Sequence, residues 1–136
     1  MADLSITAAS VAKGTNASVT STYLAGASIT AGQSVYLDTT TSTMKLADAD
    51  ALASSAAFGV ALNSASTGQP IAVQRSGSIT IGATVATGVA YYVSTTAGGI
   101  CLESDLSTGD FPHFLGFATS TTVIALDPKA CGVAKA

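Results

Sequence analysis

Residues 32–40 read GQSVYLDTT, and residues 88–96 read GVAYYVSTT. Each stretch runs from a glycine through apolar and polar side chains to a pair of threonines. In the first, Val35 and Leu37 point to one side of an extended chain and Tyr36 to the other, which is typical of a β-strand. The cluster of small polar residues that follows is typical of a turn. The two stretches therefore predict two β-hairpins of similar design.

The similarity between the two stretches continues along the chain. The alignment needs one inserted residue and one shorter connection in the second copy. The matched segments are Met44–Leu46 with Ile100–Leu102, Phe58 with Phe114, Gly59–Ala61 with Gly116–Ala118, and Ile71–Val73 with Ile124–Leu126. This shared order predicts an internal repeat, with copies at residues 29–82 and 85–134.

Short apolar runs separated by Ser, Thr and Gly clusters indicate many short strands joined by tight turns. In the first copy we expect strands at Ser34–Asp38, Met44–Leu46, Phe58–Leu62, Ile71–Arg75 and Ser78–Ile81, with one or two helical turns within Ala47–Ala57. The predicted fold class is all-β: a small antiparallel β-barrel or sandwich built from two similar halves, with at most one or two short helices.

Residues 1–28 lie outside the repeat and are expected to form an extended N-terminal arm or a first strand, before a barrel domain at 29–136. Their scattered apolar side chains cannot form a core alone. They are therefore candidate interface residues: Leu4, Ile6, Val11, Val19, Tyr23 and Leu24. If the segment is an arm, deletion of Met1–Ala27 should leave the barrel folded but weaken binding to a partner.

The composition favours contact with other proteins. Only 10% of the 136 residues are charged, against about 25% in an ordinary soluble domain. Such a neutral surface can be buried with few charges to desolvate. The net charge is −3, and the five basic residues are scattered, which argues against direct binding of nucleic acid. No apolar run approaches the ~20 residues of a membrane span, and the first residues do not resemble a secretion signal.

From the sequence we expect that the protein is not an enzyme and that it has no cofactor or metal site. The single histidine, His113, lacks a nucleophile motif, and Asp48 and Asp50 lack the rest of a calcium-binding loop, so helix capping is the better interpretation of Asp48. Cys101 and Cys131 match no zinc spacing, and neither they nor His113 has an assigned role. The acidic residues of one later segment are expected to lie in a solvated loop: Glu103, Asp105 and Asp110.

Four ordered strings carry a resemblance to a known family: Ile29–Asp38, Met44–Ala49, Phe58–Asn63 and Gly68–Gln74. From Ala2 to about Val133 the chain resembles the capsid decoration (cement) proteins of tailed bacteriophages. The resemblance implies a β-rich subunit, made in the bacterial cytoplasm, that binds the major capsid protein on the outside of the head. It also implies contacts with copies of itself, often as a trimer, and reinforcement of the shell.

Two other interpretations remain open. A tail or fibre subunit would share the composition but assemble into tubes or fibres. A small ligand-binding β-barrel would need a pocket lined by aromatic and polar groups, and the few aromatic residues of this chain are mostly needed for its core.

Overall fold

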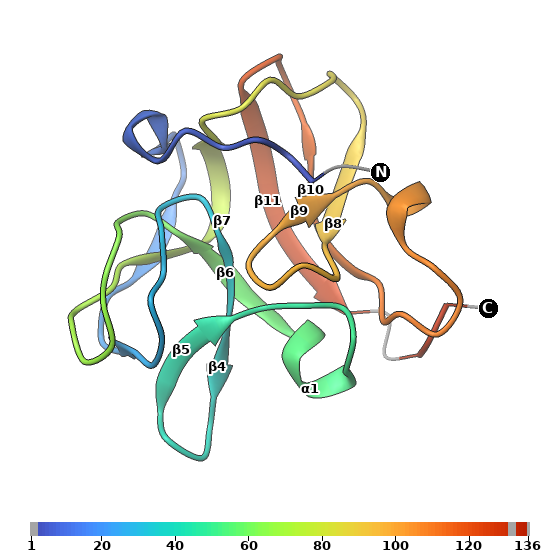
Figure 1. The fold of residues 1–136 in the computed structure, drawn as a ribbon. Helices are drawn as coiled ribbons and strands as arrows, with labels where there is room; N and C mark the ends of the chain where they lie inside the picture. The colour runs from blue at the N-terminus through green and yellow to red at the C-terminus, as the bar shows by residue number, and fades with distance from the viewer. Residues whose placement is uncertain (1–2, 131–132, 136) are drawn as a thin grey trace.

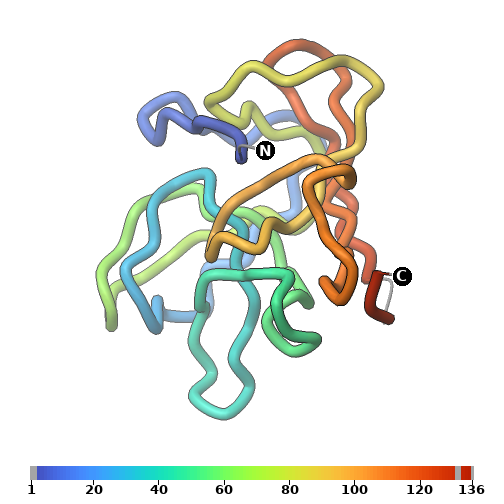
Figure 2. The backbone as a smooth tube through the Cα atoms, turned by 45° about the vertical axis from the view of Figure 1, so that its right-hand side comes forward, coloured from blue at the N-terminus to red at the C-terminus, as the bar shows by residue number. Residues whose placement is uncertain are grey.

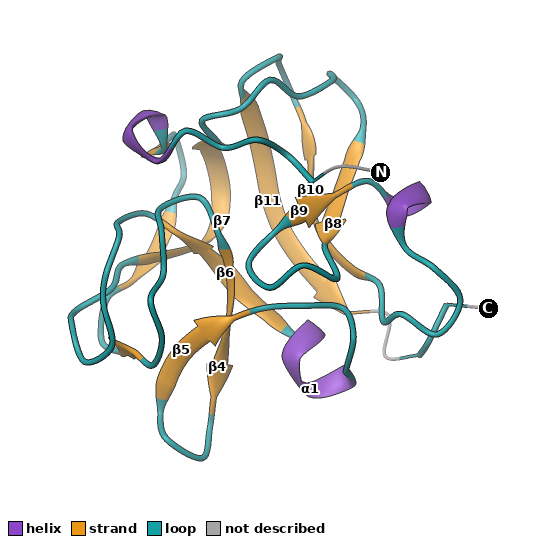
Figure 3. Ribbon diagram, viewed as in Figure 1, coloured by secondary structure: helices purple, strands orange, loops and turns teal. Residues whose placement is uncertain are grey.

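The computed structural model describes residues 3–130 and 133–135, and it confirms the all-β class (Figures 1 and 3). The strands are β1 (Ala12–Lys13), β2 (Ser18–Thr20), β3 (Leu24–Ala25), β4 (Ser34–Asp38), β5 (Thr43–Leu46), β6 (Ala57–Ala61), β7 (Val73–Thr80), β8 (Ala90–Val93), β9 (Ile100–Cys101), β10 (His113–Ala118) and β11 (Val123–Ala130). The helical segments are one α-helical turn, α1 (Leu52–Ser55), and two 3-10 turns, Ala8–Ser10 and Glu103–Asp105.

The strands form one sheet in the order β3–β5–β4–β6–β7–β11–β10–β8–β9, with β1 and β2 also paired to β7. The predicted barrel is not formed, because β3 and β9 end this path without pairing to each other. The sheet is also mixed, since the short β3 runs parallel to β5 while every other pair is antiparallel. Figure 2 shows the β4–β5 hairpin (cyan) at one end of the molecule and the turns before β8 and β11 at the other.

Strand β7 joins two half-sheets. Val73 and Gln74 pair with β6, whereas Gly77–Thr80 pair with β11. The two strands expected at 71–75 and 78–81 are therefore a single strand. Its change of direction is stabilised by the Gln74 side chain, whose Nε2 donates hydrogen bonds to the carbonyl oxygens of Ser76 and Ser78. At Gly77 the backbone adopts φ +89°, a conformation that glycine tolerates best.

The two half-sheets have the same connectivity. The first half has the strand order β5–β4–β6–β7, and the second has the equivalent order β9–β8–β10–β11. The two halves meet where β7, the last strand of the first, pairs with β11, the last strand of the second. In each half a hairpin is followed by a short helical turn and then by two more strands. The segment with the strongest sequence signal, Ser34–Asp38, forms β4 with the predicted bounds.

Gly59 and Gly116 occupy matching places in the two halves. Each lies at a shift of register in its strand, and a Cβ atom on either would collide with a backbone carbonyl oxygen of the next strand, that of Gln74 or Ala125.

The strand pairing corrects the alignment of the two repeat copies in two places. Val73 pairs with Ala61 in the first half, and Ile124 pairs with Ala118 in the second. Ile124 therefore corresponds to Val73 and not to Ile71, so this part of the alignment is displaced by two residues. Phe114 lies opposite Tyr92 as Ala57 lies opposite Tyr36, so Phe114 corresponds to Ala57 and not to Phe58.

Residues 4–14 cross the second half-sheet from its edge strand β9 to β7, the strand that joins the two half-sheets. The Leu4 amide donates to the Ile100 carbonyl at 2.8 Å, the Thr7 amide donates to Gly82 at 2.8 Å, and Ala12 pairs with Thr80 on β7. Leu4, Ile6 and Val11 pack on the larger core, which also contains Ile79 and Leu115. This part of the N-terminal segment is thus an integral element of the domain.

Candidate functional site

The six candidate interface residues do not form one surface. Leu4, Ile6 and Val11 are partly buried against the larger core. Tyr23 packs against the smaller core, and its ring lies edge-on to Phe58 with 6.0 Å between centroids. Val19 on β2 and Leu24 on β3 are 39% and 46% exposed. Two of the six are therefore open to a partner, while the other four contribute to packing.

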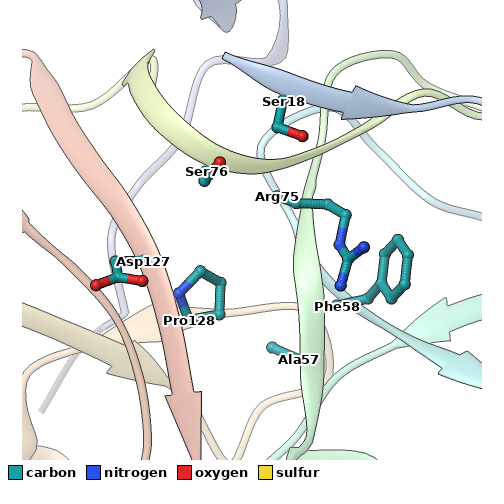
Figure 4. A pocket seen from close by; sticks show the side chains of 7 residues that line it. All are labelled: Ser18, Ala57, Phe58, Arg75, Ser76, Asp127 and Pro128. Carbon is teal, nitrogen blue, oxygen red and sulfur yellow. The ribbon is translucent and has the colours of Figure 1, made fainter. Parts of the chain in front are cut away.

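A fork opens where β7 passes from β6 to β11. Gln74 is the last β7 residue paired with β6 and Gly77 is the first paired with β11, so Arg75 and Ser76 lie between the two partners. We call the depression at this place the fork pocket. Its volume is about 340 Å³ and its lining residues are Ser18, Ala57, Phe58, Arg75, Ser76, Asp127 and Pro128 (Figure 4).

The fork pocket carries one stacked cation. The Arg75 guanidinium carbon lies 4.0 Å from the centroid of the Phe58 ring, an arrangement favoured by the negative face of the aromatic ring. Asp127, on the far side of the pocket in Figure 4, forms an ion pair with Lys129 at 3.2 Å and not with Arg75. Each carboxylate that forms an ion pair among the described residues does so with a lysine. The guanidinium of Arg75 therefore has no carboxylate partner among these residues.

A second exposed feature lies on the second half-sheet. Ala90, Phe117 and Ala125 lie side by side across β8, β10 and β11, and we call them the Phe117 row. The Phe117 ring is 49% exposed. The corresponding row of the first half, Ser34, Val60 and Gln74, is completely buried. The same position in the repeat is thus covered by the rest of the chain in one half and open in the other.

His113 is buried, with 5% of its surface exposed, and neither ring nitrogen has a hydrogen-bond partner among the described residues. Burial lowers the pKa of His113 below its ordinary value of 6.5, because the charged imidazolium would lose its hydration. No charged group contributes to this shift. The side chain therefore has the properties of a neutral packing residue.

We expect the domain to lose stability as the pH falls through about 6.5. The unfolded chain binds a proton at His113 near that pH, whereas the folded chain does so only at a lower pH. Between the two pKa values, protonation favours the unfolded state. Urea unfolding at pH 7.5, 6.5 and 5.5 should show this loss in the wild type and a flatter profile in His113→Leu. Equal profiles would mean that another group is responsible, although His113 is the only histidine.

Cys101 and Asp48 are each accounted for by burial or hydrogen bonding in the described part of the chain. Burial, with smaller contributions from Asp3, Asp105 and Asp110, raises the pKa of the Cys101 thiol to about 12, which keeps it protonated at neutral pH. The expected cap at Asp48 is wrong, since Ala51 precedes α1, and the Asp48 carboxylate instead accepts hydrogen bonds from the Asp50 amide and the Ser54 hydroxyl. Cys131 lies outside the described residues.

No group of three His, Cys, Asp or Glu side chains suited to a metal ion occurs within residues 3–130 and 133–135. Over the same residues, no helix has the length and apolar content of a membrane span.

Sequence reasoning missed the three side chains that stand out in the structure: Arg75, Phe58 and Phe117. Arg75 was one of five scattered basic residues, and nothing in the sequence tells which of them lacks a partner. From the sequence, Phe58 and Phe117 are indicated only as members of strands. The one available signal was that Arg75 is the only arginine of the chain, a residue type enriched in protein interfaces.

Comparisons with protein-family models, with curated proteins and with solved structures found no match to this chain.

Proposed function

We propose that the protein is a structural subunit of a tailed-phage virion that binds the outer surface of the head and stabilises it. It is made in the host cytoplasm, contacts the major capsid protein and associates with copies of itself, with a trimer as the expected form. The proposal rests on the resemblance of the sequence to capsid decoration proteins, joined to one structural observation. That observation is the Phe117 row, an uncharged sheet surface left open in one half and covered in the other.

The surface chemistry supports a role in protein contacts. Ala90 and Ala125 are small, so they leave the Phe117 ring standing above an uncharged row. Burial of these three side chains by a partner would remove apolar area from water without placing a charge of the row itself in the interface. Many such contacts on a regular lattice can stabilise a shell even if each is weak, because the copies bind only the assembled form.

The direct experiment compares phage heads with and without the protein. Decorated heads should release their DNA at a higher temperature than bare heads, and at a given temperature they should survive chelation of divalent ions longer. The binding should depend only weakly on salt, because few charged groups take part. Equal stability of bare and decorated heads would remove the proposed function, and assembly into tubes or fibres would favour a tail subunit.

Replacement of Phe117 by serine should weaken self-association. The wild-type ring is half-exposed, and its transfer into an interface contributes on the order of 1–2 kcal/mol, or about tenfold in the association constant. Sedimentation or light scattering over a concentration series would measure the change. Leu52→Ser is the matched control, since Leu52 is 52% exposed on α1, away from the row. A wild-type protein that stays monomeric at every concentration would contradict this prediction.

A further inference from the structure

The fork pocket presents a cation that the folded chain leaves free. Lys45, Lys129 and Lys135 each contact a carboxylate within 3.2 Å. Arg75, at the base of the fork, stacks on the Phe58 ring and forms no ion pair among the described residues. In a chain with net charge −3, a guanidinium that has no carboxylate partner among the described residues is available to an acidic group from outside.

The guanidinium is also held in place before any partner arrives. Phe58 supports one face of it, and Tyr23 packs edge-on against Phe58, so three side chains from three parts of the chain form one stack. Binding through such a stack costs less side-chain entropy than binding through a free arginine. Arginine is one of the residue types enriched among the side chains that contribute most to protein interfaces.

The remaining walls narrow the chemistry of the ligand. Ser18 and Ser76 place hydroxyl groups at the pocket, while Asp127 carries a negative charge at the wall opposite Arg75 (Figure 4). A single planar anion can accept two parallel hydrogen bonds from a guanidinium. A polyanion such as nucleic acid would bring further negative charges close to Asp127. The pocket therefore suits one carboxylate better than a row of phosphates.

We propose that the fork pocket binds an acidic side chain, Asp or Glu, on the protein shell that this subunit covers, with Arg75 as the bidentate donor. The inference rests on the proposed function, because it takes the partner to be the head surface. It adds to that function the chemistry of one contact with the head, a salt bridge between Arg75 and a carboxylate. It also agrees with weak dependence on salt, since a single charge pair gives a shallow slope.

The test on particles uses Arg75→Lys and Arg75→Ala, with Lys13→Ala as a matched control. Lys13 is an exposed basic residue on β1 that also lacks an ion pair among the described residues, so its loss changes the net charge equally. Loss of a charge-assisted bidentate contact should weaken head binding by about 10- to 100-fold in Arg75→Ala. Arg75→Lys should recover little of it, because a lysine cannot form the paired hydrogen bonds. Lys13→Ala should bind as the wild type does.

A second measurement separates this inference from the proposed function. Acetyl-Gly-Glu-Gly-amide and acetyl-Gly-Gln-Gly-amide are titrated into the wild type, and the Arg75 Nε–H signal is followed by NMR. A shift with the Glu peptide alone supports the anchor even if the protein ignores phage heads. If Arg75→Ala binds heads as well as the wild type, or if both peptides shift the signal equally, the anchor is overturned. A larger response to a short oligonucleotide than to the Glu peptide would also overturn it.

Discussion

Deletion of residues 1–27 is expected to abolish cooperative folding, and not merely to weaken binding to a partner. The deletion removes β1, β2 and β3, which pair with β7 and β5. It also removes Ile6 and Val11 from the larger core, and Tyr23 and Ala25 from the smaller one. The edges of β7 would then be open, with unpaired backbone groups and exposed apolar side chains, a combination that favours aggregation.

Circular dichroism and thermal melting of the truncated chain would test this, with two point variants as finer probes. Ile6→Ala removes a partly buried side chain and should lower the free energy of unfolding by about 2 kcal/mol. Ser5→Ala, at the exposed neighbouring position, should change it by less than about 0.5 kcal/mol. A truncated protein that melts cooperatively near the wild-type temperature would restore the interpretation of this segment as a dispensable arm.

For residues 1–28 the sequence predicts an extended arm or a first strand, because their apolar residues show no regular period. The alternation at Leu4 and Ile6 ends at the 3-10 turn Ala8–Ser10, and residues 4–14 pair with residues more than 60 positions away in the chain. Long-range pairing of this kind leaves little trace in local sequence. By contrast, β4 was predicted with its observed bounds, since Ser34–Asp38 alternates cleanly between two turns.

The join between the half-sheets was predicted only in part. The sequence predicts two strands here, Ile71–Arg75 and Ser78–Ile81, because the small residues Ser76 and Gly77 between them are typical of a turn. In the folded chain β2 pairs along the other side of β7 from Val73 to Ser76, and the side chain of Gln74 binds the carbonyl groups at the bend. The pairing with β2 and the hydrogen bonds of Gln74 therefore override the local preference for a turn. The fork in which Arg75 lies follows from the change of partner from β6 to β11 along this continuous strand.

Replacement of either Gly59 or Gly116 by alanine is expected to destabilise the domain strongly and to a similar extent. At both positions the added Cβ would come closer than 3.0 Å to the carbonyl oxygen of the neighbouring strand, a distance that real Cβ atoms essentially never show. The obstacle is backbone, so the two strands must separate or the sheet must bend. We expect a loss of about 3 kcal/mol, the upper range for overpacking, and a fall of about 10 °C in melting temperature.

Gly88→Ala is the matched control for this prediction. Gly88 has φ +82°, so alanine is strained there, but nothing lies within 4 Å of the added Cβ. Its expected cost is about 1 kcal/mol, the penalty of the left-handed conformation alone. Melting curves of the three variants would separate collision from backbone strain. If Gly59→Ala or Gly116→Ala melts no lower than Gly88→Ala, the close approach of the strands is not a constraint. If only one of the two melts much lower, the half-sheets are not equivalent at this position, because the same collision in the same register should cost each half alike.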